Sequence, residues 1–416
     1  MKKVITFLGI RPQLTKYQYQ GQVYEGHVFA EAIRQFSDFD LMLVFVTKEA
    51  LTNSYPALAA LQDERIVPIQ IPTGENSAEM WTTFEAITEA VDKEDSVIFD
   101  ITHSLRSIPF LVFLAAAFLK SAKQVKIEAI FYGAFELQKD AQGNSRPAPV
   151  IELSEFVSLL DWMNASEQFI KLGDAKALVE QLRKTKPSYQ LQQHNQTVKM
   201  QSISLSNAAT ALEKVSRALR LILPDRAMEA SEDLQGHLVA ATDAMMTWAR
   251  PFSVLSQQVL QAYAPLALSH SRDAKNLVAS LNRERYLIKW YLERNLLAQA
   301  IATAREWLIT WGLLQAGYDN PYEKTVRREV EEAFNHANKQ RQNSAGHFDD
   351  YCFTTAIHLT TIPAIGKALD LYASIADLRN TLMHAGKRES KIPTDKLERN
   401  AMKFCEQLHE LPMPSK

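Results

Sequence analysis

Short apolar runs alternate with amphipathic stretches over the first 135 residues of the chain. Five runs rich in β-branched and aromatic residues predict strands, at Val4–Leu8, Leu41–Val46, Ile66–Ile71, Val97–Ile101 and Ile127–Tyr132. Helical stretches separate them, among them Tyr24–Phe36, Met80–Val91 and Ile108–Ala122. Because continuous apolar strands alternating with helices are typical of a parallel sheet covered on both faces, we expect an open α/β domain first.

A polar segment with glycine and prolines, Lys139–Pro149, predicts a domain boundary, and helical periodicity dominates after it. The predicted helices are Phe156–Leu182, Ala208–Leu223, Leu234–Ala249, Val254–Ala262, Leu277–Arg294, Leu296–Leu314, Lys324–Lys339 and Ile365–Ala385. The glutamine-rich segment Lys184–Met200 predicts a loop, and Phe353–Ile362 is a further helix candidate. We therefore expect an α/β domain over 1–150, a helical connector over 151–200 and a helical domain over 201–416. The boundaries within 151–277 stay open.

Composition excludes several classes of protein. The net charge of the 416 residues is −2, and the first 150 contain 14 basic and 18 acidic residues, so a strongly basic DNA-binding domain is excluded. The two cysteines, Cys352 and Cys405, form neither a disulfide scaffold nor a CxxC pair, and we expect no metal. The longest apolar run, Ile108–Leu119, is shorter than the ~20 residues of a membrane span, so we expect a soluble cytoplasmic protein without membrane contact.

Polar and basic residues follow several of the predicted strands. Since ligands of open α/β sheets bind beyond the carboxyl ends of the strands, these residues are candidates for a ligand site. They are Gly9 and Arg11, then Thr47 and Lys48, then Thr102, His103, Ser104 and Arg106. Small polar residues before a helix favour an anion, although Ser104 or Ser107 could equally be a plain helix cap. Asp100 could cap, orient His103 or bind a ribose hydroxyl.

The last long helix candidate has two distinct faces. At 100° per residue, Leu371, Ile375, Leu378 and Leu382 form one apolar stripe. The opposite face presents Arg379, Asn380, Met383 and His384 together. A homodimer interface along a two-fold axis would explain the methionine there and would double the set of Arg, Asn and His. An exposed helix face without any function is the alternative.

The motifs, taken together and in order, resemble those of the CRISPR-associated CARF–HEPN ribonucleases, in particular the subgroup with an Asp-x-Thr-His-Gly motif. The matching segments are Thr6–Gly9 with the tyrosines downstream, Val46–Ala50, Asp100–Pro109, Trp162 with Gly173–Ala175, Ile288–Leu292 with Ala304–Trp307, and Arg379-Asn-x-x-x-His384. They are distributed over nearly the whole chain.

The resemblance implies a Rossmann-like CARF domain that binds cyclic oligoadenylate, followed by an all-α HEPN domain. It implies ligand contacts at Gly9, Arg11, Thr47, Lys48, Thr102, His103, Ser104 and Arg106, and catalysis by Arg379 and His384 with help from Asn380. The implied function is a metal-independent endoribonuclease of type III CRISPR antiviral defence. Cyclic oligoadenylate would activate it, and single-stranded RNA would be cleaved in a composite site of a homodimer or higher homo-oligomer.

These residue types suit attack by the RNA 2′-hydroxyl. Histidine can transfer the protons near neutral pH, arginine can stabilise the charged phosphorane, and we expect a 2′,3′-cyclic phosphate product and no cofactor. The family's glycine after Thr-His is Ser104 here, so the ring size of the activator is open; we favour cyclic tetraadenylate over cyclic hexaadenylate. The alternatives are a CARF-type transcriptional regulator controlled by ligand and a catalytically inactive HEPN sensor.

Overall fold

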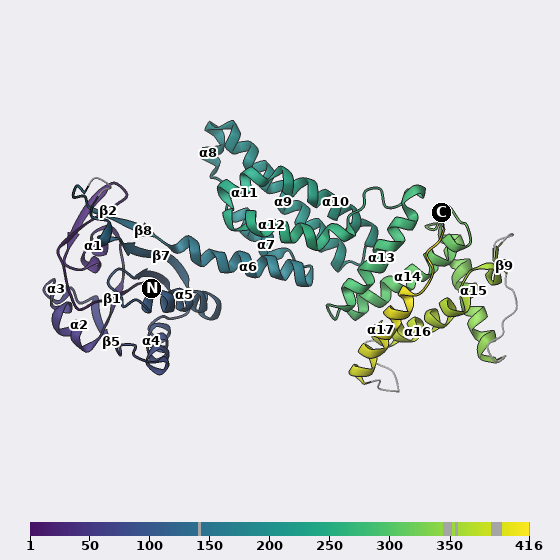
Figure 1. The fold of residues 1–416 in the computed structure, drawn as a ribbon, viewed down its shortest axis with the longest axis horizontal. Helices are drawn as coiled ribbons and strands as arrows, with labels where there is room; N and C mark the ends of the chain where they lie inside the picture. The colour runs from purple at the N-terminus through teal and green to yellow at the C-terminus, as the bar shows by residue number, and fades with distance from the viewer. Residues whose placement is uncertain (140–142, 344–351, 354–356, 384–392, 416) are drawn as a thin grey trace. The chain divides into compact units, whose positions relative to one another are not determined.

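The computed structural model describes the chain except for residues 140–142, 344–351, 354–356, 384–392 and 416 (Figure 1). The chain divides into two compact units, Met1–Asp161 and Trp162–Lys416. The predicted fold class, an α/β domain followed by a helical one, is confirmed. The predicted border at residue 150 lies inside strand β8 (Ala148–Glu152), and residue 200, the predicted end of a connector, lies inside helix α9 (Gln196–Arg220).

A mixed sheet of eight strands forms the centre of the first unit as far as the structure describes it, in the order β3-β2-β8-β7-β6-β1-β4-β5. Its other strands are β1 (Lys2–Leu8), β2 (Thr15–Tyr19), β3 (Gln22–Gly26), β4 (Leu41–Val46), β5 (Ile66–Gln70), β6 (Ser96–Asp100) and β7 (Lys126–Gly133). The five strands β7-β6-β1-β4-β5 are parallel, whereas β8 is antiparallel to β7 and β3 is antiparallel to β2.

Helices cover both faces of this sheet, as the continuous apolar strands predict. They are α1 (Phe29–Phe36), α2 (Lys48–Asn53), α3 (Tyr55–Ala59), α4 (Ser77–Glu89) and α5 (Ile108–Lys123). Alternate residues of β1 enter two separate cores: Val4 and Leu8 belong to the core that contains α1, and Ile5 and Phe7 belong to the core that contains α5. The residues that follow β1 are thereby held between two packed layers.

The edge of the sheet differs from the sequence prediction. The predicted helix Tyr24–Phe36 is wrong at its start, because Tyr24 lies in β3 and the helix begins at Phe29. A tight turn at Gln20 and Gly21, both with positive φ (49° and 82°), joins β2 to β3. The two strands of this hairpin carry many polar residues on their exposed positions, so they lack the continuous apolar pattern of the central strands.

The second unit is helical apart from a short ladder of β9 (Cys352–Phe353) and β10 (Ile357–His358). Its described helices are α7 (Lys176–Lys184), α8 (Tyr189–His194), α9, α10 (Pro224–Ala240), α11 (Thr242–Trp248), α12 (Arg250–Tyr263), α13 (Leu277–Leu292), α14 (Leu297–Gln315), α15 (Lys324–Asn343), α16 (Ile365–Met383) and α17 (Thr394–His409). The border between the units falls within α6 (Ser154–Leu172). One continuous apolar core connects these helices except α8, and it includes the fully buried Trp307 and Trp311.

Three predictions for this unit need correction. The predicted helix Phe156–Leu182 is two helices, because Gly173 adopts a positive φ of 72° where an added Cβ would lie 2.9 Å from the Trp290 ring. The predicted loop Lys184–Met200 contains α8 and the start of α9. The helix candidate Phe353–Ile362 is wrong where the structure describes it, since Phe353 lies in β9. No helix in the described ranges is long and apolar enough to cross a membrane.

Candidate functional site

The predicted ligand residues of the first unit lie where the strand order of the sheet reverses. The five parallel strands follow one another along the chain as β1, β4, β5, β6 and β7, but in the sheet β1 lies between β4 and β6. The strand order therefore reverses beside β1. Ligands of open α/β sheets bind in the crevice at this reversal, outside the carboxyl ends of the strands. Gly9, directly after β1, packs against the loop after β6, and a Cβ on Gly9 would lie 2.8 Å from the backbone oxygen of His103.

A buried hydrogen-bond network holds the loop after β6. Asp100 is fully buried, accepts a bond from the Thr6 hydroxyl at 2.6 Å and accepts another from the Thr102 backbone N–H at 2.8 Å. Burial raises the pKa of the Asp100 carboxyl to about 6. The Thr102 hydroxyl accepts a bond from the Gly133 N–H at 2.8 Å, which ties this loop to the end of β7. These bonds hold the loop after β6 in place, and they include no contact of Asp100 with His103.

His103 lies at the rim in its neutral form. Its ring stacks on Phe135 with the centroids 5.9 Å apart, and its Nε2 lies 3.2 Å from the Tyr17 hydroxyl. Burial lowers the pKa of the imidazole to about 4, because the charged form is poorly solvated there. His103 can therefore offer a ligand a hydrogen bond or a ring face at neutral pH, but no positive charge.

The hydroxyls of two further candidates are engaged within the protein. Ser104 donates its hydroxyl proton to the Ile101 carbonyl at 2.8 Å, and Thr47 accepts a bond from the Ala50 N–H at 3.2 Å as the cap of α2. Ser107 precedes α5 without a side-chain capping bond. Ser54, which the sequence did not single out, donates a bond of 2.5 Å to the Gly9 carbonyl and so fixes the turn after β1.

The basic candidates are the exposed ones. Arg11 follows β1, Lys48 follows β4 and Arg106 follows β6, and all three side chains are exposed. Since β6, β1 and β4 are adjacent and parallel, the three cations follow the same edge of the sheet. An anionic ligand at this edge would meet these charges first.

The second predicted set lies on α16. Leu371, Ile375 and Leu378 are buried, as the helical wheel predicts, while Arg379 is exposed and Asn380 is half-buried. His384 lies outside the described residues, so its predicted place beside Arg379 stays a prediction. Arg379 lines a cavity of about 600 Å³, whereas Asn380 is not among the residues that line it.

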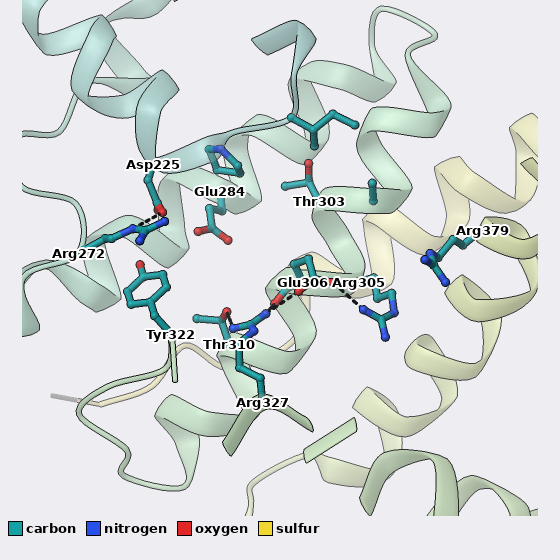
Figure 2. Close-up of a pocket in the computed structure, with 13 residues that line it drawn as sticks. Asp225, Arg272, Glu284, Thr303, Arg305, Glu306, Thr310, Tyr322, Arg327 and Arg379 are labelled. Atoms are coloured by element: carbon teal, nitrogen blue, oxygen red, sulfur yellow. Dashed lines mark hydrogen bonds and ion pairs between the residues drawn. The ribbon is translucent and has the colours of Figure 1, made fainter. Parts of the chain in front are cut away.

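Figure 2 shows this cavity with a ring of charged side chains around it. Arg305 and Glu306 come from α14, Arg327 from α15, Glu284 from α13, and Arg272 and Tyr322 from the segments between helices. Arg327 donates to Glu306 at 2.7 Å and to the Thr310 hydroxyl at 3.0 Å. Arg272 donates to Asp225 at 2.7 Å and lies 4.7 Å from the centre of the Tyr322 ring.

The sequence had not assigned any of these surrounding residues to a site. The many charged residues of Lys324–Glu332 would suggest a solvated helix face, but the Arg327 side chain is only 18% exposed. Arg305 and Glu306 lie in a segment that the family resemblance had already matched. Among the described residues, no group of three or more His, Cys, Asp or Glu side chains is arranged to hold a metal ion.

Comparisons with known proteins give two likenesses. Over 108 residues the chain is 30% identical to CRISPR-associated protein MJ1674 of Methanocaldococcus jannaschii, a stretch that covers 25% of this chain and 16% of the relative. The solved structure of Enterococcus italicus Csm6 bound to cyclic hexa-2'-fluoro-hexa-dAMP aligns over 98% of this chain and 92% of that chain, with 10% identity and a TM-score of 0.42. No model of a protein family matches. Over that quarter of its length the chain is thus similar to a CRISPR-associated protein.

Proposed function

We propose that the chain is a CRISPR-associated CARF–HEPN ribonuclease of type III antiviral defence, acting in the cytoplasm. The first unit would sense cyclic oligoadenylate, and the second would cleave single-stranded RNA. The sequence similarity to a CRISPR-associated protein and the order of the motifs support this assignment. The observation that carries it is Arg379, an exposed arginine that lines a cavity and forms no hydrogen bond or ion pair with any described residue.

The sensor site would be the edge of the sheet at the reversal of strand order. Arg11, Lys48 and Arg106 would meet the phosphates, since His103 is neutral and supplies no charge. Gly9 would keep the turn after β1 close against the loop after β6, since a Cβ there would lie 2.8 Å from the backbone oxygen of His103. His103 and Phe135 would offer stacked rings to an adenine.

Ser104 bears on the ring size of the activator. Its hydroxyl is directed to the Ile101 carbonyl, so the extra side-chain atoms add no free hydroxyl at the rim. The serine that replaces the family's glycine would therefore affect the ligand by the volume it occupies and not by a new hydrogen bond. We favour cyclic tetraadenylate, the smaller ring, over cyclic hexaadenylate.

The second unit would carry the chemistry. His384 would transfer a proton from the 2′-hydroxyl or to the 5′-oxygen that leaves, and Arg379 would stabilise the charge of the phosphorane. Asn380, one position along α16, would help to orient the phosphate. The nucleophile belongs to the RNA, so the reaction needs no metal and leaves a 2′,3′-cyclic phosphate.

A homodimer would complete both sites. On the first unit, Phe110, Leu114 and Phe118 recur every fourth residue on α5, and all three side chains are exposed. Trp81 of α4 is 63% exposed and extends this apolar face through Phe84, whose ring centroid lies 5.5 Å from that of Phe118. Contiguous exposed apolar side chains of this kind mark interaction surfaces, and we propose that a second copy of the chain covers them.

The test separates ligand binding from RNA cleavage. Calorimetric titration with cyclic tetraadenylate and cyclic hexaadenylate should show tight binding of one ring, and a fluorophore–quencher RNA should be cleaved only when that ring is present. Binding with cleavage supports the ribonuclease. Binding without any cleavage would contradict it and point to a regulator or an inactive sensor; absence of binding would contradict the sensor assignment.

A further inference from the structure

Tyr17 is a buried residue whose hydroxyl reaches the proposed sensor site. It lies on β2, is fully buried, and packs its ring against Phe29 with the centroids 4.8 Å apart. A Cβ on Gly133, at the end of β7, would lie 2.8 Å from the same ring, so the tyrosine fills the space beside that glycine. The Tyr17 hydroxyl lies 3.2 Å from Nε2 of His103. Its position relative to the loop after β6 is therefore fixed by packing on both sides of the ring.

The Tyr17 hydroxyl has one hydrogen-bond partner among the described residues, and that partner is Nε2 of His103. The Thr15 hydroxyl is also near, but it donates to the Gln13 carbonyl at 2.9 Å. A buried phenol that finds no acceptor loses the bond that water gives it in the unfolded chain, which is unfavourable. Satisfying the Tyr17 proton therefore requires Nε2 to accept it.

Both partners of this bond are neutral at pH 7. Burial raises the pKa of the Tyr17 phenol, and the charges of Asp100 and Glu31 act in the same direction, so the phenol keeps its proton. Burial lowers the pKa of the His103 imidazole to about 4, so the ring carries a single proton. In a neutral imidazole the hydrogen bond at one nitrogen decides the role of the other.

The second nitrogen of the ring, Nδ1 of His103, is open to solvent. It forms no hydrogen bond with a described residue, and it is not one of the buried polar atoms of the described chain that lack a partner. Phe135 covers one face of the ring at an interplanar angle of 16° and so limits its rotation. The edge that carries Nδ1 is the part of the ring that a ligand can reach.

From these contacts we propose that Tyr17 is a positioning residue of the sensor site: it donates to Nε2 and thereby fixes His103 as a hydrogen-bond donor through Nδ1. A donor at this place favours a ligand atom with a lone pair, such as a phosphate oxygen or a ring nitrogen of adenine. The reverse tautomer would present an acceptor to the ligand and leave the Tyr17 proton without its partner. This inference rests on the proposed sensor function, and it adds a neutral donor of fixed direction to the cations at the rim.

Ring nitrogen resonances test the placement of the proton in the absence of ligand. Full-length protein is labelled with ¹⁵N in its histidine rings, and the signals of His103 are those that disappear in His103→Asn. At pH 7 we expect Nε2 to resonate as an unprotonated acceptor and Nδ1 as a protonated donor. In Tyr17→Phe, which keeps the packed ring, part of the proton population should move to Nε2. A protonated Nε2 in the wild type would overturn the inference.

A double-mutant cycle tests whether the placed proton serves ligand binding. Calorimetric titration with the cyclic oligoadenylate compares wild type, Tyr17→Phe, His103→Asn and the double variant. Tyr17→Phe should weaken binding about three- to tenfold, which corresponds to one hydrogen bond. An asparagine amide supplies its own donor near the position of Nδ1, so Tyr17→Phe should have no further effect beside His103→Asn. An equal loss in both backgrounds would indicate a purely structural role and overturn the inference.

Tyr24→Phe is the matched control. Tyr24 lies on β3 of the same hairpin, and its hydroxyl donates to the Gln22 side chain at 2.6 Å, so this variant should bind ligand as the wild type does. Wild-type affinity in Tyr17→Phe would overturn the inference even if the protein binds its activator and cleaves RNA. If the wild type binds neither ring, the sensor function is refuted, and the ring spectrum still decides between the two tautomers of His103.

Discussion

The substitution Glu284→Gln should stabilise the second unit in a strongly pH-dependent way. In the unfolded chain this glutamate ionises near its ordinary pKa of 4.5, whereas in the folded cavity the pKa is about 8. Between these values the unfolded chain releases its proton and the folded chain retains it. The free energy of unfolding therefore falls as pH rises from 4.5 to 8, and this contribution is fully favourable only below 4.5.

The size of the effect follows from the shift. For each pH unit between the two pKa values, the ionisation of Glu284 lowers the free energy of unfolding by about 1.4 kcal/mol. At pH 7 this contribution makes the wild type about 3 kcal/mol less stable than at pH 4.5. Glu284→Gln carries no charge in either state and avoids this loss. Because ~1 kcal/mol moves Tm by roughly 2–4 °C in a domain of this size, the variant should gain about 6–12 °C over wild type at pH 7 and little at pH 4.5.

Tryptophan fluorescence is the suitable readout, because five of the six tryptophans lie in the second unit. Thermal unfolding of wild type and variant would be compared at pH 4.5, 6, 7 and 8. Subtracting the two curves removes the contribution of distant groups that titrate alike in both proteins. A stability difference that is the same at every pH would refute a buried, neutral Glu284.

Three further variants test other parts of the structure. Gly9→Ala should lower stability by about 1–3 kcal/mol, because its Cβ would press on a backbone oxygen 2.8 Å away, and Gly236→Ala, which meets nothing within 4 Å, should not destabilise; chemical denaturation measures both. Phe110→Glu should reduce the dimer to monomer in light scattering after gel filtration, while Val254→Glu, at a similarly exposed site, should leave the mass unchanged. Arg106→Ala should weaken binding of cyclic oligoadenylate at least tenfold and flatten its dependence on salt.

The central sheet could be predicted because its strands are buried on both faces. Leu41–Val46 has the same bounds in sequence and structure, since every position there is apolar and no other element fits. The hairpin of β2 and β3 was missed because one face of each strand is polar, and its Gln-Gly turn is not among the usual hairpin dipeptides. Local pattern therefore identifies doubly covered strands and overlooks edge strands.

The two sites were predictable to different degrees. Residues that follow parallel strands share one edge by topology alone, so the placement of Arg11, Lys48 and Arg106 follows from the strand order. Glu284 could not be found this way, because Asn282–Arg285 reads as the exposed side of a helix. Its burial depends on α10, α14 and α15 packing around α13, which no local pattern records.

Arginine 379 tests the central claim most directly. Purified protein is incubated with 5′-labelled single-stranded RNA in EDTA, with and without cyclic tetraadenylate or cyclic hexaadenylate, beside Arg379→Ala and His384→Ala. The account predicts cleavage that one ring switches on, products that end in a 2′,3′-cyclic phosphate, and loss of cleavage in both variants while ligand binding persists. Cleavage that survives in either variant, or products that end in a 3′-hydroxyl, would contradict it.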